Sequence, residues 1–329
     1  MIKFLIFRTD RIGDYIFSRI LIEAIKSKYP NNRIDCVCSL YNSKYIKYYN
    51  DIKKIYILDK YNLSLLIRNI IKINKEKYDY LIVLDGKRRS IFFSLLLKAK
   101  KKYAILKDFR PLNLLKVFYS DFFINSEVNS QFDNFVSVVN YLNIKIPKKI
   151  NYYNSYNFKK IYFKKLKSKF TLIHLDEKWF EGYYYSDFKY MNLNYKNFEQ
   201  FINLIRKKFK KNIVITTGGV KVDQLSLIKQ KFFDKYDKNT YLSKKNKHHI
   251  ILIDNTEFRD LEKIVSLCSE IICCEGAISH VSHALEKNTI ALINNIKTAK
   301  FWTQHMSKLK LIKRGNISRI SRDIENIIF

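Results

Sequence analysis

The sequence predicts two doubly wound α/β domains in series, and three observations support this fold class. Short apolar runs alternate with amphipathic stretches of helical period, which is typical of parallel-sheet α/β domains. The alternation occurs twice, separated at 146–156 by Pro147 and a run of asparagine and tyrosine without clear period. The length of 329 residues suits two domains of ordinary size. We expect domains at 1–150 and 157–315, with a terminal segment at 316–329.

The first domain is predicted to begin with a buried strand at 2–7. A turn follows, and then a helix whose apolar residues recur at helical spacing and stop before Pro30. Apolar runs predict three further strands, at 33–38, 54–58 and 80–84. The last helix of this half carries its apolar side chains on one face, at Phe132, Phe135, Val136, Val139 and Leu142.

The second domain repeats this pattern. Its strands are predicted at 171–174, 213–217, 250–253, 270–274 and 289–293, and we expect the last of these to close the sheet. Helices are predicted at 195–208, 258–267 and 279–285. The polar, lysine-rich stretch 235–247 is expected to be an exposed loop. A terminal helix is predicted from Ile320, Ile324, Ile327 and Ile328.

Doubly wound sheets bind ligands at the carboxyl ends of their strands, so the segments between a strand and a helix are the candidate sites. The first is Arg8-Thr9-Asp10-Arg11-Ile12-Gly13-Asp14. Gly13 is expected to permit a tight turn, and Asp14 falls in the first helical turn. There it could act as a general base towards a hydroxyl, and the simpler alternative is that it only stabilises the helix N-terminus.

The second candidate segment is Cys274-Glu275-Gly276-Ala277-Ile278-Ser279-His280. Backbone N–H groups at the start of this helix, with Gly276 allowing close approach, form an anion site suited to a pyrophosphate. Glu275 at the strand end could bind sugar or ribose hydroxyls. The alternative is an ordinary strand–helix turn in which Ser279 caps the helix.

Two shorter segments follow other strands of the second domain. Lys178, in Lys178-Trp179, could neutralise charge on a leaving phosphate, or be one more surface lysine in a lysine-rich chain. Gly218-Gly219 could let the backbone approach a nucleotide, or form a simple tight turn.

Composition limits the class of protein. No apolar run approaches the roughly eighteen residues that span a bilayer, and the charges of Arg8, Asp10 and Arg11 interrupt the apolar start. Five cysteines without a paired framework fit a reducing interior, so we expect a cytoplasmic protein. The net charge of +32 favours anionic membranes, phosphorylated glycans or nucleotides. AT-rich codons would also produce this excess of lysine, so charge alone does not choose among them.

We expect no metal site. The chain has no D-x-D pair, no P-loop and no G-x-G-x-x-G fingerprint. His248-His249 lies at the edge of a polar loop without partner carboxylates, and Cys36-x-Cys38 and Cys273-Cys274 fall in buried strands. We therefore expect the two histidines at the surface and the four cysteines in the packed cores.

Taken in order, these segments resemble the lipopolysaccharide heptosyltransferase family (glycosyltransferase family 9). Its members begin with an apolar strand and a short loop that ends in Gly-Asp, as residues 4–14 do here. A Lys-Trp follows the first strand of the second domain, matched by Lys178-Trp179, and a strand ending in glycine is matched by 213–219. The strongest family signature is an Asp-x-Gly-x-x-His-like loop that opens a helix, matched by 275–285. The resemblance covers nearly the whole chain.

The resemblance implies a GT-B architecture, in which two Rossmann-like domains face a cleft. Residues 1–150 would bind the acceptor, 157–315 would bind the donor, and the helix within 316–329 would cross back to the first domain. It also implies inversion at the anomeric carbon without metal or other cofactor, with Asp14 as base. The donor would be a nucleotide-diphosphate sugar such as ADP-heptose, and the acceptor a lipopolysaccharide-type or related surface glycan.

The candidate donor contacts are Lys178, Gly218, Gly219, Glu275, Gly276, Ala277, Ile278, Ser279 and His280. The candidate acceptor contacts are Arg8, Arg11, Gly13 and Arg88, with Lys87 and Arg89 beside them, which would steer an anionic glycan. We expect this acceptor to be lipid-linked at the inner face of a bacterial inner membrane, which a basic surface would contact.

Two departures and two alternatives accompany this interpretation. Glu275 stands where the family has Asp, and one residue of that loop is missing, so the donor sugar could differ from a heptose. The loop before Lys178 lacks the small hydroxyl residues expected near donor phosphates. A transferase of the same architecture for another sugar is one alternative. A basic nucleic-acid-binding protein is the other, but the aromatic residues (15%) mostly follow core periodicity.

Overall fold

The computed structural model describes residues 1–59, 61–106, 119, 122–125, 130–146, 169–180, 191, 193–246 and 249–329. The chain divides into two compact units, Met1–Ser155 and Tyr156–Phe329. The division falls inside the linker predicted at 146–156, of which 147–156 lie outside the described residues. No helix in the described ranges is long and apolar enough to cross a membrane.

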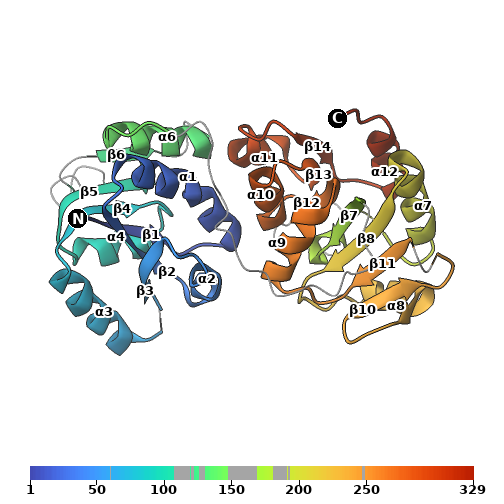
Figure 1. Ribbon diagram of the computed structural model, residues 1–329, viewed down its shortest axis with the longest axis horizontal. Helices are drawn as coiled ribbons and strands as arrows, with labels where there is room; N and C mark the ends of the chain where they lie inside the picture. The colour runs from blue at the N-terminus through green and yellow to red at the C-terminus, as the bar shows by residue number, and fades with distance from the viewer. Residues whose placement is uncertain are drawn as a thin grey trace. The chain divides into compact units, whose positions relative to one another are not determined.

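The described residues of the first unit form a parallel sheet of six strands in the order β3-β2-β1-β4-β5-β6. Its strands are β1 (Ile2–Arg8), β2 (Asn32–Cys38), β3 (Ile52–Ile57), β4 (Tyr78–Val83), β5 (Ala99–Leu106) and β6 (Phe122–Asn125). Its helices are α1 (Ile12–Lys28), α2 (Leu40–Ile46), α3 (Leu63–Lys75), α4 (Arg88–Leu95) and α6 (Gln131–Tyr141). Figure 1 shows α1 and α6 on one face of this sheet and α3 and α4 on the other.

The strand order reverses at β1, because the chain first adds β2 and β3 on one side and then returns to add β4 on the other. Ligands of doubly wound sheets bind at such a switch point, outside the carboxyl ends of the two central strands. Residues Phe4 to Phe7 of β1 are at most 1% exposed, since helices cover both faces, and this explains the continuous apolar run in the sequence.

The second unit has the same parallel order, extended by a hairpin. Its described strands lie in the order β14-β13-β12-β7-β8-β11-β10-β9, and the switch point lies between β7 and β12. These strands are β7 (Phe170–Leu175), β8 (Asn212–Thr217), β9 (Phe233–Lys235), β10 (Thr240–Ser243), β11 (Ile250–Ile253), β12 (Glu270–Cys274), β13 (Asn288–Ile293) and β14 (Leu309–Lys313).

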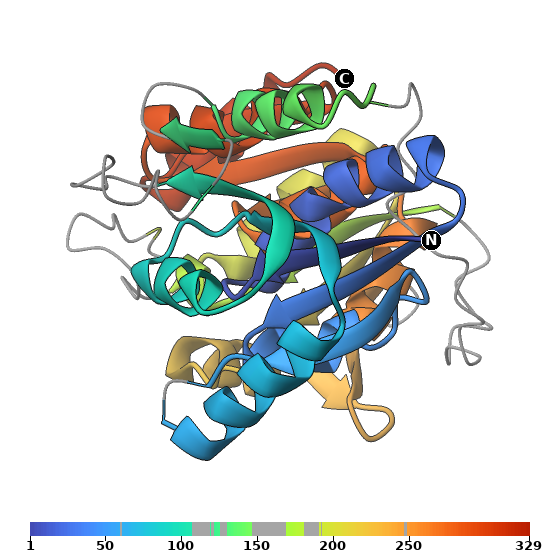
Figure 2. The same ribbon diagram turned by 90° about the vertical axis from the view of Figure 1, so that its left-hand side faces the viewer.

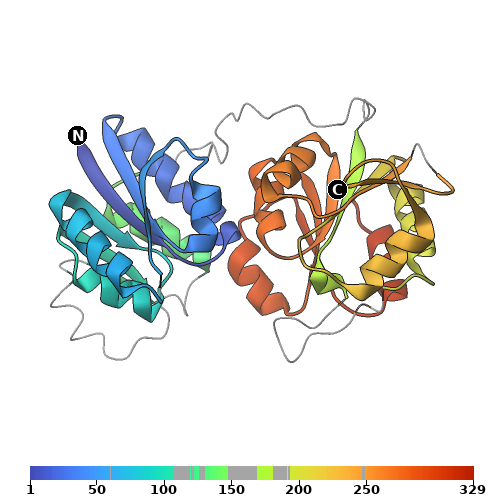
Figure 3. The same cartoon turned by 90° about the horizontal axis from the view of Figure 1, so that it is seen from below.

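Helices cover both faces of this sheet, with α9 and α10 on one side and α7 and α12 on the other (Figure 1 and Figure 3). The helices are η1 (Glu177–Trp179), α7 (Phe198–Phe209), α8 (Asp223–Phe232), α9 (Phe258–Leu267), α10 (Ala277–Ala284), α11 (Ile296–Thr303) and α12 (Ile317–Glu325). Trp179 and the apolar faces of α7 and α12 meet in one core with the central strands.

Three predictions about the second unit were wrong. The stretch 235–247 is not a plain loop, because its described part contains β10 and the end of β9, whose antiparallel pairing extends the sheet. Strand β13 does not close the sheet, since β14 pairs with it in parallel. Both errors concern strands at or next to an edge of the sheet, which are largely exposed and lack the continuous apolar run of central strands. The terminal helix ends at Glu325, so Ile327 and Ile328 lie beyond it.

The terminal helix α12 buries Ile317, Ile320 and Ile324 in the core of the second unit, where it packs against α7. Asn316 caps it by accepting a hydrogen bond from the Ser318 N–H. The apolar face of α12 is therefore used within its own unit. The expected crossing of 316–329 to the first domain stays a prediction.

Candidate functional site

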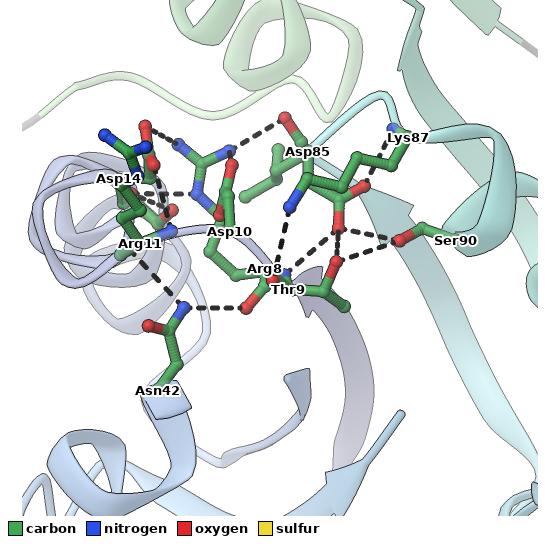
Figure 4. A network of polar contacts seen from close by, with 11 residues as sticks. Arg8, Thr9, Asp10, Arg11, Asp14, Asn42, Asp85, Lys87 and Ser90 are labelled. Carbon is green, nitrogen blue, oxygen red and sulfur yellow. Dashed lines mark hydrogen bonds and ion pairs between the residues drawn. The ribbon is translucent and has the colours of Figure 1, made fainter. Parts of the chain in front are cut away.

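The buried side chain of Arg8 organises the segment between β1 and α1 (Figure 4). The Arg8 side chain is 1% exposed. Its Nε donates to the Asp14 carbonyl at 2.8 Å and its Nη1 donates to the Leu84 carbonyl at 2.9 Å. Its Nη1 lies 3.2 Å from Asp10 Oδ2, and its Nη2 lies 3.8 Å from Asp14 Oδ1. A buried guanidinium between two carboxylates holds the loop in place.

Asp85, the residue that follows Leu84 after β4, joins this loop to the neighbouring strand. Its carboxylate is 0% exposed and accepts hydrogen bonds from the Thr9 N–H at 3.0 Å and the Thr9 hydroxyl at 2.6 Å. The Ser90 hydroxyl at 2.7 Å and the Lys87 N–H at 3.2 Å complete the set. Figure 4 shows these groups converging on Asp85. The loops at the carboxyl ends of β1 and β4 are therefore fixed to each other.

Asp14 lies in the first turn of α1 with 18% of its side chain exposed. Its Oδ2 accepts the Arg11 N–H at 3.0 Å, which is the helix-stabilising role considered as the simpler alternative. The other oxygen, Oδ1, lies 3.8 Å from Arg8 Nη2. Both roles are thus compatible, because one oxygen stabilises the helix while the carboxylate reaches solvent.

Asp10 stands beside Asp14, and its side chain is only 10% exposed. Burial raises the pKa of Asp10 to about 7, against the opposing effect of Arg8, and the nearby charges of Asp14 and Asp85 add to the rise. A carboxyl group with a pKa near neutrality can exchange a proton at physiological pH. The sequence pattern does not reveal the raised pKa of Asp10, because the burial of this side chain and the charges around it depend on the fold.

The predicted acceptor contacts differ in accessibility. Arg11 and Arg88 are exposed, and Arg88 begins α4 immediately after the Asp85 loop. Arg8 is buried in the ion-pair network, so it cannot present its charge to a solvent-borne glycan as predicted. Gly13 is buried within α1 and its φ is not positive, so the expected tight turn is not there. The chain turns at residues 9–11 instead.

The second unit brings two predicted segments together at its switch point. Lys178 follows β7, Glu275 and Gly276 follow β12, and the Lys178 Nζ donates to the Glu275 carbonyl at 2.9 Å. A Cβ atom on Gly276 would lie 2.6 Å from this Nζ, so glycine leaves the space that the ammonium fills. These residues are 97 positions apart in the sequence and meet because β7 and β12 are neighbours.

Trp179 anchors Lys178. The indole is 0% exposed, donates through Nε1 to the His174 carbonyl at 2.8 Å and packs against Phe201. Burial disfavours the charged ammonium of Lys178, but the carboxylates, Asp176 first, outweigh it and raise the pKa of Lys178 to about 12. Its Nζ lies 3.4 Å from Asp176 Oδ2, and 18% of its side chain is exposed. The site thus holds a fixed positive charge next to the start of α10.

Some N–H groups in the first turn of α10 form hydrogen bonds within the turn, and others point away from the helix without an acceptor among the described residues. The Gly276 N–H donates to the Ser279 hydroxyl at 3.3 Å, and the Ser279 N–H donates to the Gly276 carbonyl at 3.1 Å. Ser279 therefore caps the helix, as its alternative role suggested, and is 0% exposed. No acceptor within the described ranges uses the N–H groups of Ala277 and Ile278. These two remain for an anion, beside Lys178.

The other predicted donor contacts are placed as follows. Glu275 is half-buried, and its N–H donates to the Leu292 carbonyl of β13 at 3.0 Å. His280 lies on the buried side of α10, 7% exposed. Gly218 and Gly219 follow β8, on the far side of β7 from β12. A Cβ on Gly218 would meet nothing within 4 Å, and one on Gly219 would meet Asn255 Oδ1 at 3.3 Å, so crowding does not demand glycine at 218.

Sequence reasoning missed three acidic residues at these two switch points. Asp10 lies in the first candidate segment without an assigned role, Asp85 follows the strand predicted at 80–84, and Asp176 follows the strand predicted at 171–174. All three follow the carboxyl ends of central strands, and that position was the available signal. In the described part of the chain, no three His, Cys, Asp or Glu side chains group closely enough to hold a metal ion. The five cysteines are buried and unpaired.

Comparison with known proteins identifies the fold. No family model matches the chain, and no curated protein does. Among solved structures, E. coli heptosyltransferase WaaC with ADP-2-deoxy-2-fluoro heptose is 10% identical, with 98% of this chain and 99% of that chain covered and a TM-score of 0.71. A family 9 glycosyl transferase from Veillonella parvula is 12% identical over 99% of this chain and 90% of that chain, with a TM-score of 0.67.

A third structure, the E. coli ADP-heptose lipopolysaccharide heptosyltransferase II, is 12% identical over 98% of this chain and 97% of that chain, with a TM-score of 0.66. Identities this low establish architecture and not activity. The chain therefore has the α/β fold of the GT-B glycosyltransferases, in the form found in the heptosyltransferases.

Proposed function

We propose that this protein is a glycosyltransferase that moves a sugar from a nucleotide-diphosphate donor to a hydroxyl of an anionic glycan. The observation that carries the proposal is the contact between Lys178 and the Glu275 carbonyl, beside the N–H groups of Ala277 and Ile278, which have no acceptor among the described residues. A fixed ammonium and a helix N-terminus together form a site for a diphosphate. Likeness to structures that hold ADP and an ADP-heptose analogue supports the same assignment.

The acceptor is assigned to the first unit, with Asp14 as general base. The acceptor hydroxyl gives its proton to the Asp14 carboxylate while its oxygen forms a bond to the anomeric carbon of the donor. The bond from that carbon to the diphosphate oxygen breaks, and the diphosphate leaves with the electron pair. Attack opposite the leaving group inverts the anomeric configuration. Arg11 and Arg88, which are both exposed, attract the acidic glycan.

The positive charge of the donor site offsets the charge that builds up on the leaving diphosphate. Lys178 carries a pKa of about 12, so its ammonium stays protonated throughout the physiological range. Each preorganised donor at such a position contributes roughly 3 kcal/mol to the transition state. We propose that this arrangement serves in place of a divalent cation, and that transfer needs no metal or other cofactor.

The donor sugar is proposed to be a heptose, carried as ADP-heptose, and the acceptor a lipid-linked lipopolysaccharide or related surface glycan. Glu275 is the residue that decides between a heptose and another sugar, because it stands at the end of β12, next to the diphosphate site. Its carboxylate reaches further than aspartate by one methylene. A different sugar on the same nucleotide is the alternative that this residue favours.

Thermal-shift measurements with ADP, UDP, GDP and CDP test the donor assignment. A ligand present at a hundredfold its Kd, and bound only by the native state, stabilises by about 2.7 kcal/mol, which raises Tm by a few degrees. We expect one diphosphate to give this shift and its sugar conjugate to give transfer to a glycan, detected by mass spectrometry. Absence of a shift with every diphosphate, together with tight and salt-sensitive RNA or DNA binding, would instead indicate a nucleic-acid-binding protein.

A further inference from the structure

Helix α3 of the first unit carries an uncovered apolar row. Leu63, Ile67 and Ile71 follow one another at four-residue spacing and are 69%, 50% and 51% exposed. The neighbouring side of the helix, about a quarter turn away, packs on the sheet through Ile73 and the partly buried Leu66 and Ile70. A helix needs only one apolar face to bind its own domain, so the second row has no role in folding.

Helix α4 continues this apolar surface. Phe92 and Leu96 are also four positions apart and are 58% and 57% exposed. The two helices are joined at their ends, because Asn74 of α3 donates to the Leu96 carbonyl at 3.1 Å and accepts the Lys98 N–H at 2.7 Å. Figure 2 shows α3 in blue beside α4 in teal on one side of this unit. We call Leu63, Ile67, Ile71, Phe92 and Leu96 the α3–α4 face.

Cations border this face. Exposed cationic side chains lie on α3 beside the apolar row and around the end of α4, at Arg68, Lys72, Lys75, Lys98, Lys100 and Lys101. The two acidic residues that follow α3 along the chain are already paired, Glu76 with Arg33 at 2.8 Å and Asp79 with Lys100 at 2.8 Å. No aspartate or glutamate lies on α3 or α4 themselves.

We propose that the α3–α4 face docks on the surface of an anionic lipid bilayer. Apolar side chains flanked by lysine and arginine suit this occupant, because the former enter the headgroup boundary while the latter contact anionic lipids. A second copy of the chain fits less well, since it would oppose two sets of cations. A nucleic acid would contact the cations but leave the apolar row uncovered.

The location of this face gives it a use if the proposed function holds. Helix α4 begins with Arg88, directly after the Asp85-Gly86-Lys87 loop that is fixed to the β1–α1 segment. Docking through α3 and α4 would therefore place α4, whose Arg88 end adjoins this loop, at the bilayer surface, where a lipid-linked acceptor lies. The docking itself rests on the exposed residues alone, and its test needs no transfer activity.

Co-sedimentation of the full chain with vesicles tests the proposal. Vesicles of phosphatidylcholine alone and with added phosphatidylglycerol are compared, each at low and physiological salt. The apolar variant is Ile67→Asn/Ile71→Asn, and the charge variant is Arg68→Gln/Lys72→Gln. The matched control is Leu267→Asn/Ile296→Asn in the second unit, where the apolar side chains are 45% and 50% exposed. All three variants change exposed side chains only, and their Tm values check the fold.

We expect the wild type to bind vesicles that contain phosphatidylglycerol and to bind phosphatidylcholine far more weakly. The apolar variant should bind roughly tenfold more weakly or worse, the charge variant should lose most of its salt dependence, and the control should match the wild type. Equal binding by the apolar variant and the wild type would overturn the proposal. The proposal would also be overturned if the wild type did not bind vesicles, or if these variants disrupted dimerisation of the protein and not its vesicle binding. Vesicle binding without any sugar transfer would contradict the proposed function and leave the docking intact.

Discussion

Replacing Lys178 by alanine removes the cation that contacts the Glu275 carbonyl at the switch point of the second unit. Its ammonium lies 2.9 Å from the Glu275 carbonyl and 3.4 Å from Asp176. If it stabilises the departing diphosphate, kcat should fall by about a hundredfold to a thousandfold, which corresponds to about 2.7–4 kcal/mol. Binding of the free nucleotide diphosphate should also weaken, because the same charge contacts the ground state.

The variant also changes stability, and a control must separate the two effects. Asp176 has 11% of its side chain exposed and would lose its ion-pair partner, which costs roughly 1–3 kcal/mol. Lys211→Ala is the matched control. Lys211 lies 2.7 Å from Glu270, whose side chain is 5% exposed, at the opposite end of β12 from Glu275. Both variants therefore leave a buried carboxylate without its lysine.

The assay combines steady-state transfer kinetics, a Kd for the nucleotide diphosphate and a melting curve for each protein. We expect both variants to melt below the wild type, and only Lys178→Ala to lose turnover and nucleotide affinity. Equal turnover in the two variants would refute the reasoning, because Lys178 would then be one more structural lysine.

Three further outcomes are expected. Glu275→Ala should destabilise the transition state of transfer by roughly 1.5–3 kcal/mol, while the nucleotide diphosphate binds almost as before. Unchanged kinetics in both Glu275→Asp and Glu275→Ala would show that Glu275 does not bind the donor sugar. Transfer should persist in excess EDTA, and a loss restored by magnesium or manganese would contradict this. The pKa of Asp10 is about 7 in the folded protein, against an ordinary 3.8. The folded state therefore binds the Asp10 proton more tightly than the unfolded state does. The resulting contribution to the free energy of unfolding is complete below about pH 4 and is lost as the pH rises towards 7. Asp10→Asn should therefore gain stability over the wild type between pH 5 and pH 8, by at most about 4 kcal/mol, and a pH-independent difference in Tm would show that Asp10 ionises normally.

Much of the fold follows from local sequence, because central strands and amphipathic helices have strong periods. The helix predicted at 258–267 and the strand predicted at 270–274 match α9 and β12 residue for residue. Strand β14 was missed, since only Ile312 of Leu309-Lys310-Leu311-Ile312-Lys313 is buried and the strand lacks the continuous apolar run of a central strand. The hairpin of β9 and β10 was missed for the same reason.

Site residues were predictable where their position along the chain determined their role. Lys178 and Gly276 both follow central strands of a doubly wound sheet, and the switch-point rule brings such residues together. Arg8 could not be placed from sequence, because a basic residue at a strand end is ordinarily exposed. Its burial depends on Asp10, Asp14 and the Leu84 carbonyl, which the fold brings around one guanidinium. The elevated pKa of Asp10 depends on the same enclosure.

Turnover of Asp14→Asn tests the central claim most directly, once the donor and a glycan acceptor are in hand. Asparagine can still accept the Arg11 N–H that Asp14 accepts at 3.0 Å, so α1 should remain capped and Tm should change little. It cannot take a proton from the acceptor hydroxyl. We predict that transfer falls by about a hundredfold to ten-thousandfold while nucleotide diphosphate binds with unchanged Kd. A folded Asp14→Asn protein that transfers sugar at nearly the wild-type rate would contradict the account.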